Sequence, residues 1–97
     1  MTTLGTVLRR AADVRYRILD DEGVVIRQRA GEVLGLNSLG ARLLESLDGV
    51  RSTGQIVDSL ADEYEVDHEL FATDSLAFFE EMVDAGIAEV VREGGTG

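Results

Sequence analysis

The sequence predicts an α+β domain in which three antiparallel strands precede three helices. Apolar and charged residues alternate in residues 14–19 (VRYRIL), which is the period of a half-buried strand. Further along, leucines at positions 39, 43, 44 and 47 recur at helical spacing. The chain has 97 residues, of which 44% are hydrophobic. This length and composition suffice for one compact core and one domain.

Two tight turns separate the three expected strands. Residues 20–23 (DDEG) follow the first strand, and Gly23 is suited to positive φ in a hairpin turn. Residues 24–29 (VVIRQR) predict the returning strand. The pair 30–31 (AG) marks a second turn before a short third strand over residues 32–36 (EVLGL). Strands joined this closely form an antiparallel meander.

Each of the three expected helices begins at a capping residue. Asn37 precedes the leucine-rich first helix, which ends at the pair 48–49 (DG), where the glycine suits a left-handed conformation. Residues 52–55 (STGQ) match the S-x-x-Q capping box and open the second helix. The third helix is expected over residues 67–85, with its first aspartate as N-cap and Gly86 as its stop.

These elements form one expected domain over residues 13–91. Residues 87–91 (IAEVV) alternate again and predict a last short strand. Residues 1–12 are expected to be a flexible N-terminal segment, and residues 92–97 a flexible tail. Strands followed by three helices, the last two joined by a short turn, indicate a winged helix-turn-helix arrangement.

The charge distribution disfavours a nucleic-acid partner. Up to Arg51 there are eight arginines and seven acidic residues, whereas from Ser52 onward there is one arginine and twelve acidic residues. A DNA-reading helix needs cationic or amide side chains, and the third helix offers acids and no cation. No apolar run is long enough for a membrane span or follows the N-terminal arginines as in a secretory signal. We therefore expect a cytoplasmic protein that binds neither nucleic acid nor membrane.

No pattern of residues predicts catalysis. The sequence has no cysteine, glycine-rich phosphate loop or nucleophile elbow. His68 is the single histidine, so it has no histidine partner for a metal site or a proton relay. We expect no enzymatic activity, no catalytic residue, no metal and no cofactor.

One alternative function is that of an acyl or peptidyl carrier protein. Asp74-Ser75-Leu76 is the tripeptide on which such carriers attach phosphopantetheine, and the chain is small and acidic. However, residues 58–60 repeat the same triplet, which shows that the signal is weak. A carrier serine also lies at a helix N-terminus, whereas Ser75 falls about two turns into the third helix. An ordinary helix serine is the favoured interpretation.

The expected third helix has an unusually wide apolar arc, which contains all three phenylalanines of the chain. Either this helix is central to the core, or part of the arc lines a groove that is open to a ligand. The third strand lies at the edge of the meander, with Val33 and Leu34 on opposite faces. An edge strand beside an apolar groove is a peptide-binding geometry, because unpaired backbone groups invite strand addition.

Residues 36–87 resemble the PqqD-like family, the recognition domains of ribosomal peptide biosynthesis. The matching segments are LNSLGARLLESLDGVRSTGQIVDSLADEYEV and DSLAFFEEMVDAGI. The residues that fit the family pattern are Leu36, Asn37, Gly40, Leu44, Leu47, Asp48, Gly49, Ile56, Leu60, Tyr64, Asp74, Phe78 and Gly86. Met82 and Ile87 replace leucines of the pattern, Ser52 a threonine and Gln55 a glutamate, and these are mild changes.

The resemblance implies a non-catalytic RiPP recognition element, which acts as a peptide chaperone in natural product biosynthesis. Such a domain captures the leader segment of a precursor peptide as an extra antiparallel strand. It then delivers the peptide to a modifying enzyme, such as a radical SAM enzyme, a cyclodehydratase or a lasso-peptide leader peptidase. The implied peptide-binding residues are Arg27, Arg29, Glu32, Val33, Leu34, Gly35, Leu36, Phe71, Asp74, Ser75 and Phe78. For Arg27 and Arg29, contact with acidic leader residues and plain exposure on a strand are equally compatible with the sequence.

Overall fold

The structure is a computed structural model that describes residues 2–20 and 22–93. Its elements are, in chain order, β1 (Val7–Arg10), β2 (Val14–Leu19), β3 (Glu22–Arg27), β4 (Glu32–Asn37), α1 (Ser38–Glu45), β5 (Asp48–Ser52), α2 (Thr53–Tyr64), α3 (His68–Asp84) and β6 (Ala88–Arg92). None of the helices in the described residues is long and apolar enough to cross a membrane.

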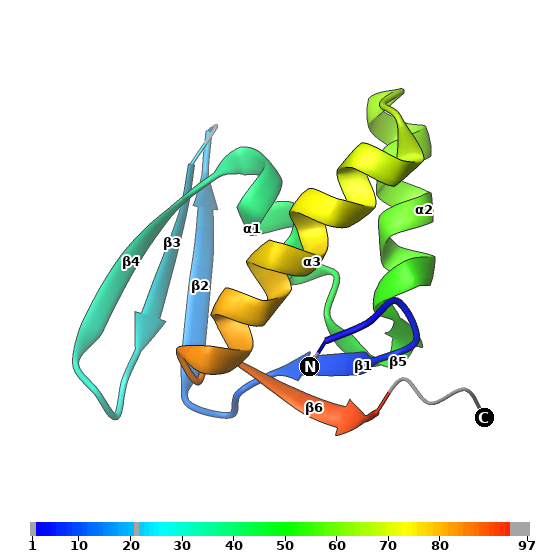
Figure 1. Cartoon of the computed structure of the whole chain (residues 1–97). Coiled ribbons are helices and arrows are strands. Elements are labelled where there is room, and N and C mark those ends of the chain that lie inside the picture. Colours follow the sequence, from blue (N-terminus) through cyan, green and yellow to red (C-terminus); the bar gives the residue numbers. More distant parts are fainter. Residues whose placement is uncertain (1, 21, 94–97) are drawn as a thin grey trace.

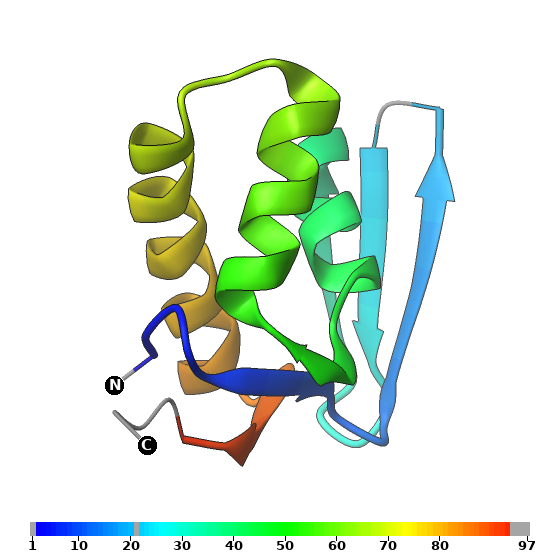
Figure 2. The same cartoon turned by 90° about the vertical axis from the view of Figure 1, so that its right-hand side faces the viewer.

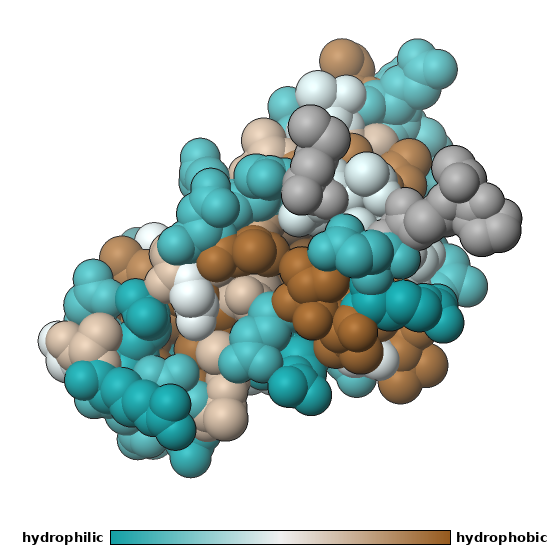
Figure 3. Space-filling model, turned by 60° about the horizontal axis from the view of Figure 1, so that its bottom comes forward, coloured by the Kyte–Doolittle hydropathy of each residue, from teal (hydrophilic) through white to brown (hydrophobic). Residues whose placement is uncertain are grey.

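The strands form two separate antiparallel sheets, with orders β2-β3-β4 and β5-β1-β6 (Figure 1). Figure 2 shows α3 on one side of the molecule and the β2–β3 hairpin on the other, with α1 and α2 between them. The α+β class is thus confirmed, but the single N-terminal sheet of the prediction is only one of two. Figure 3 views the molecule from the side of the second sheet, where apolar surface lies among hydrophilic side chains.

β1 corrects the expectation that residues 1–12 are a flexible segment. It is the central strand of the second sheet, where Val7 pairs with Ser52 of β5 and Leu8 with Val90 of β6. Val7 and Leu8 are both buried. The prediction missed β1 because this strand has only four residues, too few for a clear alternating pattern. Both strands that pair with it also lie more than 35 positions away in the sequence. The folded unit therefore begins before residue 13.

At the other end of the chain, the structure reaches partway into the expected tail over residues 92–97. Arg92 is the last residue of β6, which occupies nearly the position predicted for the last strand. Residues 94–97 lie outside the described residues.

β5 lies between the first two helices, where the sequence predicted no strand. The Asp48 carboxylate accepts hydrogen bonds from the backbone N–H groups of Val50 and Arg51, each at 2.9 Å. These bonds, assisted by the Arg51 guanidinium, lower the pKa of Asp48 to about 2. Gly49 has φ of 75°, in the left-handed region as expected, although α1 already ends at Glu45. β5 forms because this turned segment meets β1, a partner that is distant in the sequence.

The predicted helix caps are confirmed. The Asn37 side chain accepts the Gly40 N–H at 2.8 Å, and the Asp67 side chain accepts the Leu70 N–H at 3.0 Å. Both bonds of the capping box over residues 52–55 are present. These caps are correct because each depends on residues within one helical turn.

The first hairpin turn differs from the prediction. β3 begins at Glu22, two residues early, and Asp20 takes the positive φ of 53°. Gly23 lies within the strand instead, where α1 packs so closely that a Cβ on Gly23 would be 2.5 Å from the Ala41 Cβ. The glycine is required by this close approach and not by a turn. The second turn contains the expected residues 30–31 but already begins at Gln28, and Gly31 has φ of 67°.

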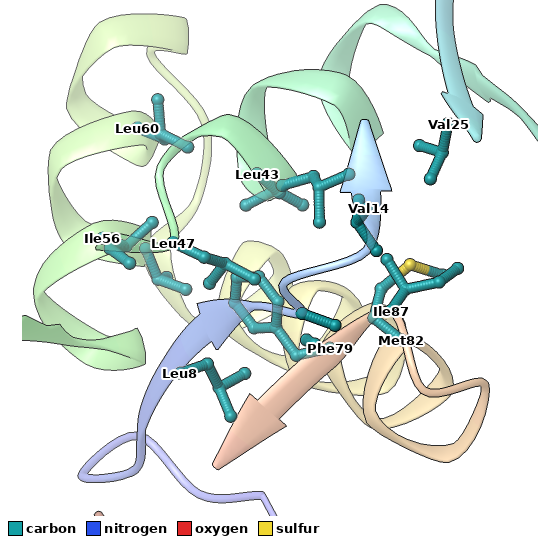
Figure 4. Close-up of a cluster of buried hydrophobic side chains, with 14 of the residues drawn as sticks. Leu8, Val14, Val25, Leu43, Leu47, Ile56, Leu60, Phe79, Met82 and Ile87 are labelled. Atoms are coloured by element: carbon teal, nitrogen blue, oxygen red, sulfur yellow. The ribbon is translucent and has the colours of Figure 1, made fainter. Parts of the chain in front are cut away.

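The hydrophobic core lies between the helices and both sheets (Figure 4). Its buried side chains come from every helix and from strands of both sheets, and include Leu8, Val25, Leu44, Ile56, Phe79 and Ile87. Phe79 of α3 is fully buried, whereas Phe78 is only partly buried against the core. α3 is therefore central to the core, and the Phe78 side of its apolar arc remains partly exposed.

His68 links the first turn of α3 to α2. Its Nε2 lies 2.8 Å from Asp62 Oδ1, and its Nδ1 lies 3.3 Å from Asp58 Oδ1. The Asp62 and Asp58 carboxylates raise the pKa of His68 above 6.5. Because the pKa of His68 is higher in the folded state than in the unfolded state, protonated His68 stabilises the fold. This stabilisation is fully present at pH values below the unfolded-state pKa. It is lost as the pH rises through the folded-state pKa.

We expect the urea midpoint of the protein to fall as the pH rises from the unfolded-state pKa of His68 through its folded-state pKa. The midpoint of the His68→Gln variant should fall less over the same pH range. Urea unfolding of both proteins at several pH values measures the difference. The same pH dependence in both proteins would contradict the ion pairs as its source.

Candidate peptide-binding site

β4 is an edge strand whose free side turns toward α3. In the order β2-β3-β4 it pairs with β3 alone. In Figure 2, β3 lies between β2 and the side of the molecule that carries α3, so the open edge of this sheet faces that helix. Val33 is 66% exposed and Leu34 packs against the core, so the two lie on opposite faces as predicted. The edge can therefore accept another strand beside α3.

The register identifies the free backbone groups of β4. Hydrogen-bonded pairs alternate with non-bonded pairs in an antiparallel ladder. The β2–β3 hairpin closes at the pair Leu19–Glu22 across two residues, which is a bonded position. The backbone N–H and C=O groups of the odd-numbered residues of β3 therefore point toward β4, where they bond to even-numbered residues. The N–H groups of Val33 and Gly35 consequently point away from β3, toward an added strand.

A cavity of about 180 Å³ lies where β4 runs into α1 and α3. Its lining comprises Asn37, Leu39, Gly40, Leu43, Phe71, Asp74, Ser75 and Phe78. All four predicted site residues of α3 are in this set, so the structure brings them together at the Asn37 end of β4. The two helices approach closely there because α1 has no side chain at Gly40, where a Cβ would be 3.4 Å from the Phe78 ring.

A second cavity, of about 390 Å³, continues along α3 toward the α2–α3 turn. It is lined by Leu39, Tyr64, Val66, Asp67, Leu70, Phe71 and Asp74. Leu39, Phe71 and Asp74 line both cavities, which therefore form one groove. Sequence reasoning did not assign Leu39, Tyr64, Val66 or Leu70 to the site. The detectable signal was the apolar Val66 in an otherwise polar interhelical turn.

Ser75 is buried, with 1% of its surface exposed, and its Oγ has no hydrogen-bond partner among the described residues. It lies in the middle of α3, far from the helix N-terminus. A transferase cannot attach phosphopantetheine to a hydroxyl in this position. The carrier-protein alternative is therefore wrong, and Ser75 belongs to the floor of the groove.

The remaining predicted residues lie at the opposite end of β4. Arg27 Nη1 is 2.6 Å from Glu32 Oε1, and the same guanidinium packs beside Gly86 after α3. Arg29 is exposed in the β3–β4 turn. A strand of six residues spans about 20 Å, so Arg27, Arg29 and Glu32 are separate from the groove at Asn37. Arg27 is engaged in an ion pair, in contrast to a freely exposed strand arginine.

Comparisons with known proteins identify relatives of this chain. Residues 18–88 match the family described as Coenzyme PQQ synthesis protein D (PqqD). A relative from Rhodopseudomonas palustris (strain BisB5), named PqqA binding protein, is 29% identical over 86 residues, which cover 89% of this chain and 82% of the relative.

Two solved structures share the fold. TbiB1, solved in complex with the TbiA(beta) leader peptide, is 26% identical with a TM-score of 0.74, over 84% of this chain and 94% of that one. The PqqD truncation of Methylobacterium extorquens PqqCD, described as a stand-alone RiPP recognition element, has a TM-score of 0.78 at 20% identity, over 92% and 95% of the two chains. The family match covers well over half of the sequence. The chain therefore belongs to the PqqD family.

Proposed function

We propose that this protein binds the leader segment of a ribosomally synthesised precursor peptide and delivers it to a modifying enzyme. The observation that carries the proposal is the free edge of β4 beside the groove of α1 and α3. Relatives of this chain are named for PqqA binding and for a complex with a leader peptide. The activity we assign is binding, without catalysis.

The edge and the groove have separate roles in this proposal. Backbone pairing with Val33 and Gly35 supplies affinity that is independent of leader sequence. Selectivity comes from alternate leader side chains, which meet Leu34 and Leu36 on the inner face of β4 and then the groove. Phe71 and Phe78 form the apolar wall of that groove, with Asp74 and Ser75 between them.

The arginines at the far end of β4 have different roles. Arg27 is paired with Glu32 and positions the β3–β4 turn against the end of α3. Arg29, exposed in that turn, is the cation that an acidic leader residue would meet.

We also infer that α2, α3 and the sheet β2-β3-β4 constitute a winged helix-turn-helix that is used for peptide binding. The exposed surface of α3 carries carboxylates, which repel a phosphate backbone. Its apolar groove instead suits the side chains of an extended peptide.

A titration tests the proposed function. The labelled leader of a precursor encoded next to this protein is expected to bind saturably with a dissociation constant of about 1 μM or lower, roughly −8 kcal/mol. Fluorescence anisotropy measures the binding, and a scrambled leader of the same composition is the control. The absence of saturable binding by any neighbouring leader would refute the proposed function.

A further inference from the structure

The sheet β2-β3-β4 has an outer face that no helix covers. Figure 1 shows α1, α2 and α3 on one side of this sheet, and none of the described elements lies on its other side. Val14, Val25 and Leu34 belong to or pack against the core and so point inward. Because side chains alternate along a strand, the residues on either side of them in the sequence point outward. This outer face has no role in the fold or in the groove described above.

Strand pairing arranges the outer face in three rows. The rows are, in order, Arg15, Ile26 and Val33; Arg17, Val24 and Gly35; and Leu19, Glu22 and Asn37. Ile26 is 39% exposed and Leu19 is 55% exposed, and Val33 is also exposed. A hollow of about 520 Å³ includes Val24 and Gly35 in its lining, and Gly35 contributes no side chain there. Apolar side chains exposed on three adjacent strands form a patch that a partner can cover.

Two arginines lie along the β2 side of this face. Within residues 2–20 and 22–93, Arg17 makes no ion pair or side-chain hydrogen bond, and Arg15 donates only to the carbonyl oxygens of Ala12 and Val14. Elsewhere in the fold, each of four arginines pairs with a carboxylate: Arg9, Arg27, Arg42 and Arg51. Glu22 lies in the third row, beside the hairpin turn. The first two rows are therefore a cationic and apolar surface on a chain whose net charge is −10. A partner surface that is acidic and apolar complements them.

The outer face is continuous with the proposed strand site. A leader strand on the free edge of β4 becomes the fourth strand of this sheet. Residues that lie opposite each other in an antiparallel pair project to the same side of the sheet. The leader residues opposite Val33 and Gly35 therefore point outward and extend the rows of the outer face. A partner that covers this face contacts the bound leader as well.

The outer face alone is small for a stable interface. Three strands about 4.8 Å apart and about 20 Å long cover roughly 300 Å², whereas a stable complex buries about 800 Å² on each partner. The bound leader enlarges the face by one strand. A partner that covers both should therefore bind the leader complex more tightly than the free protein. By linkage, that partner should raise the affinity for the leader by the same factor.

We propose that the outer face of sheet β2-β3-β4 is the docking surface for the modifying enzyme. The enzyme covers it with an acidic and apolar surface and contacts the outward side chains of the bound leader. This inference rests on the proposed function and assigns the surface used for delivery. A leader antiparallel to β4 leaves the sheet at the Glu32 end, beside the row that contains Arg15, so its downstream part reaches an enzyme docked there. The same face of a second copy is a poor occupant, because it would bring Arg15 and Arg17 against like charges.

Two variants and two matched controls test the docking surface. Arg17→Glu reverses a charge of the outer face, and Ile26→Thr removes apolar surface from it while keeping a β-branched side chain. Arg92→Glu and Val50→Thr are the controls, because they make comparable changes at exposed positions of the second sheet. The probes are the peptide-modifying enzyme encoded next to this protein and the labelled leader of the neighbouring precursor.

Surface plasmon resonance on the immobilised enzyme measures docking, with and without saturating leader. We expect Arg17→Glu to weaken enzyme binding about tenfold at low salt, with the effect shrinking as salt is added. Ile26→Thr should weaken it about threefold, and both controls should bind the enzyme as wild type does. Saturating leader should raise the affinity of the wild-type protein for the enzyme. In fluorescence anisotropy without the enzyme, both variants should bind the leader as wild type does, which shows that the fold and the strand site are intact.

Enzyme affinity that is unchanged in both Arg17→Glu and Ile26→Thr would overturn the docking surface and leave leader recognition intact. So would equal losses in the variants and in their controls, or variants that lowered only self-association in sedimentation. Enzyme affinity that is the same with and without leader would show that the docked enzyme does not contact the leader strand, which also contradicts the inference. Failure of the wild-type protein to bind any neighbouring leader would instead count against the proposed function itself.

Discussion

Replacing Val33 by proline is expected to weaken leader binding at least about tenfold, which corresponds to about 1.4 kcal/mol. Proline removes the backbone donor that the register turns toward an added strand, and its ring occupies the space of the incoming backbone. Val33 lies on an edge strand with its side chain 66% exposed, so proline there breaks no bond to β3. The effect should thus fall on binding and not on folding.

Anisotropy titration with the labelled leader measures this loss, and thermal unfolding checks that the fold is retained. Val33→Thr is the control, because it keeps the backbone N–H and the β-branched shape, and it should bind as wild type does. If Val33→Pro bound the leader as tightly as Val33→Thr, the leader would not pair with β4 at this position.

Gly23→Ala is expected to destabilise the protein by about 1–3 kcal/mol, the usual cost of overpacking. The new methyl group would lie 2.5 Å from the Ala41 Cβ, so α1 would have to move away from β3. Since α1 follows β4 directly and lines the groove, its displacement should also weaken leader binding. Urea unfolding measures the change in the free energy of unfolding.

Gly35→Ala is the matched control for this substitution. Gly35 lies in the neighbouring strand, and a Cβ there would meet nothing within 4 Å. The alanine should therefore be neutral or slightly stabilising. Adding Ala41→Gly to Gly23→Ala should recover part of the lost stability, although glycine within α1 costs about 1 kcal/mol by itself. Equal effects of Gly23→Ala and Gly35→Ala would show that steric crowding is not the cause.

Much of the candidate site followed from local signals. Asn37 caps α1 through a bond to Gly40, three residues away, and this cap places the end of β4 against the helix. The opposite faces of Val33 and Leu34 followed from strand alternation. The sequence could not reveal that Leu39, Tyr64 and Leu70 meet, since they belong to three different segments and share a cavity only after the helices pack.

Ser75 illustrates the limit of motif reasoning. Its triplet with Asp74 and Leu76 has the composition of a carrier-protein site, but the function of a serine depends on its exposure. Its position two turns into α3 could be predicted, whereas its burial depends on the tertiary packing of α3.

The sequence alone determined the helices with their caps, the β2–β3–β4 meander and the family pattern, because each of these depends on residues a few positions apart. The tertiary structure decided the rest. It made residues 7–10 the centre of a second sheet, made Gly23 a point of close contact between β3 and α1, and opened the groove beside β4. These features depend on contacts between distant segments, whose pairing is selected by burial of the whole core and has no counterpart in a local pattern.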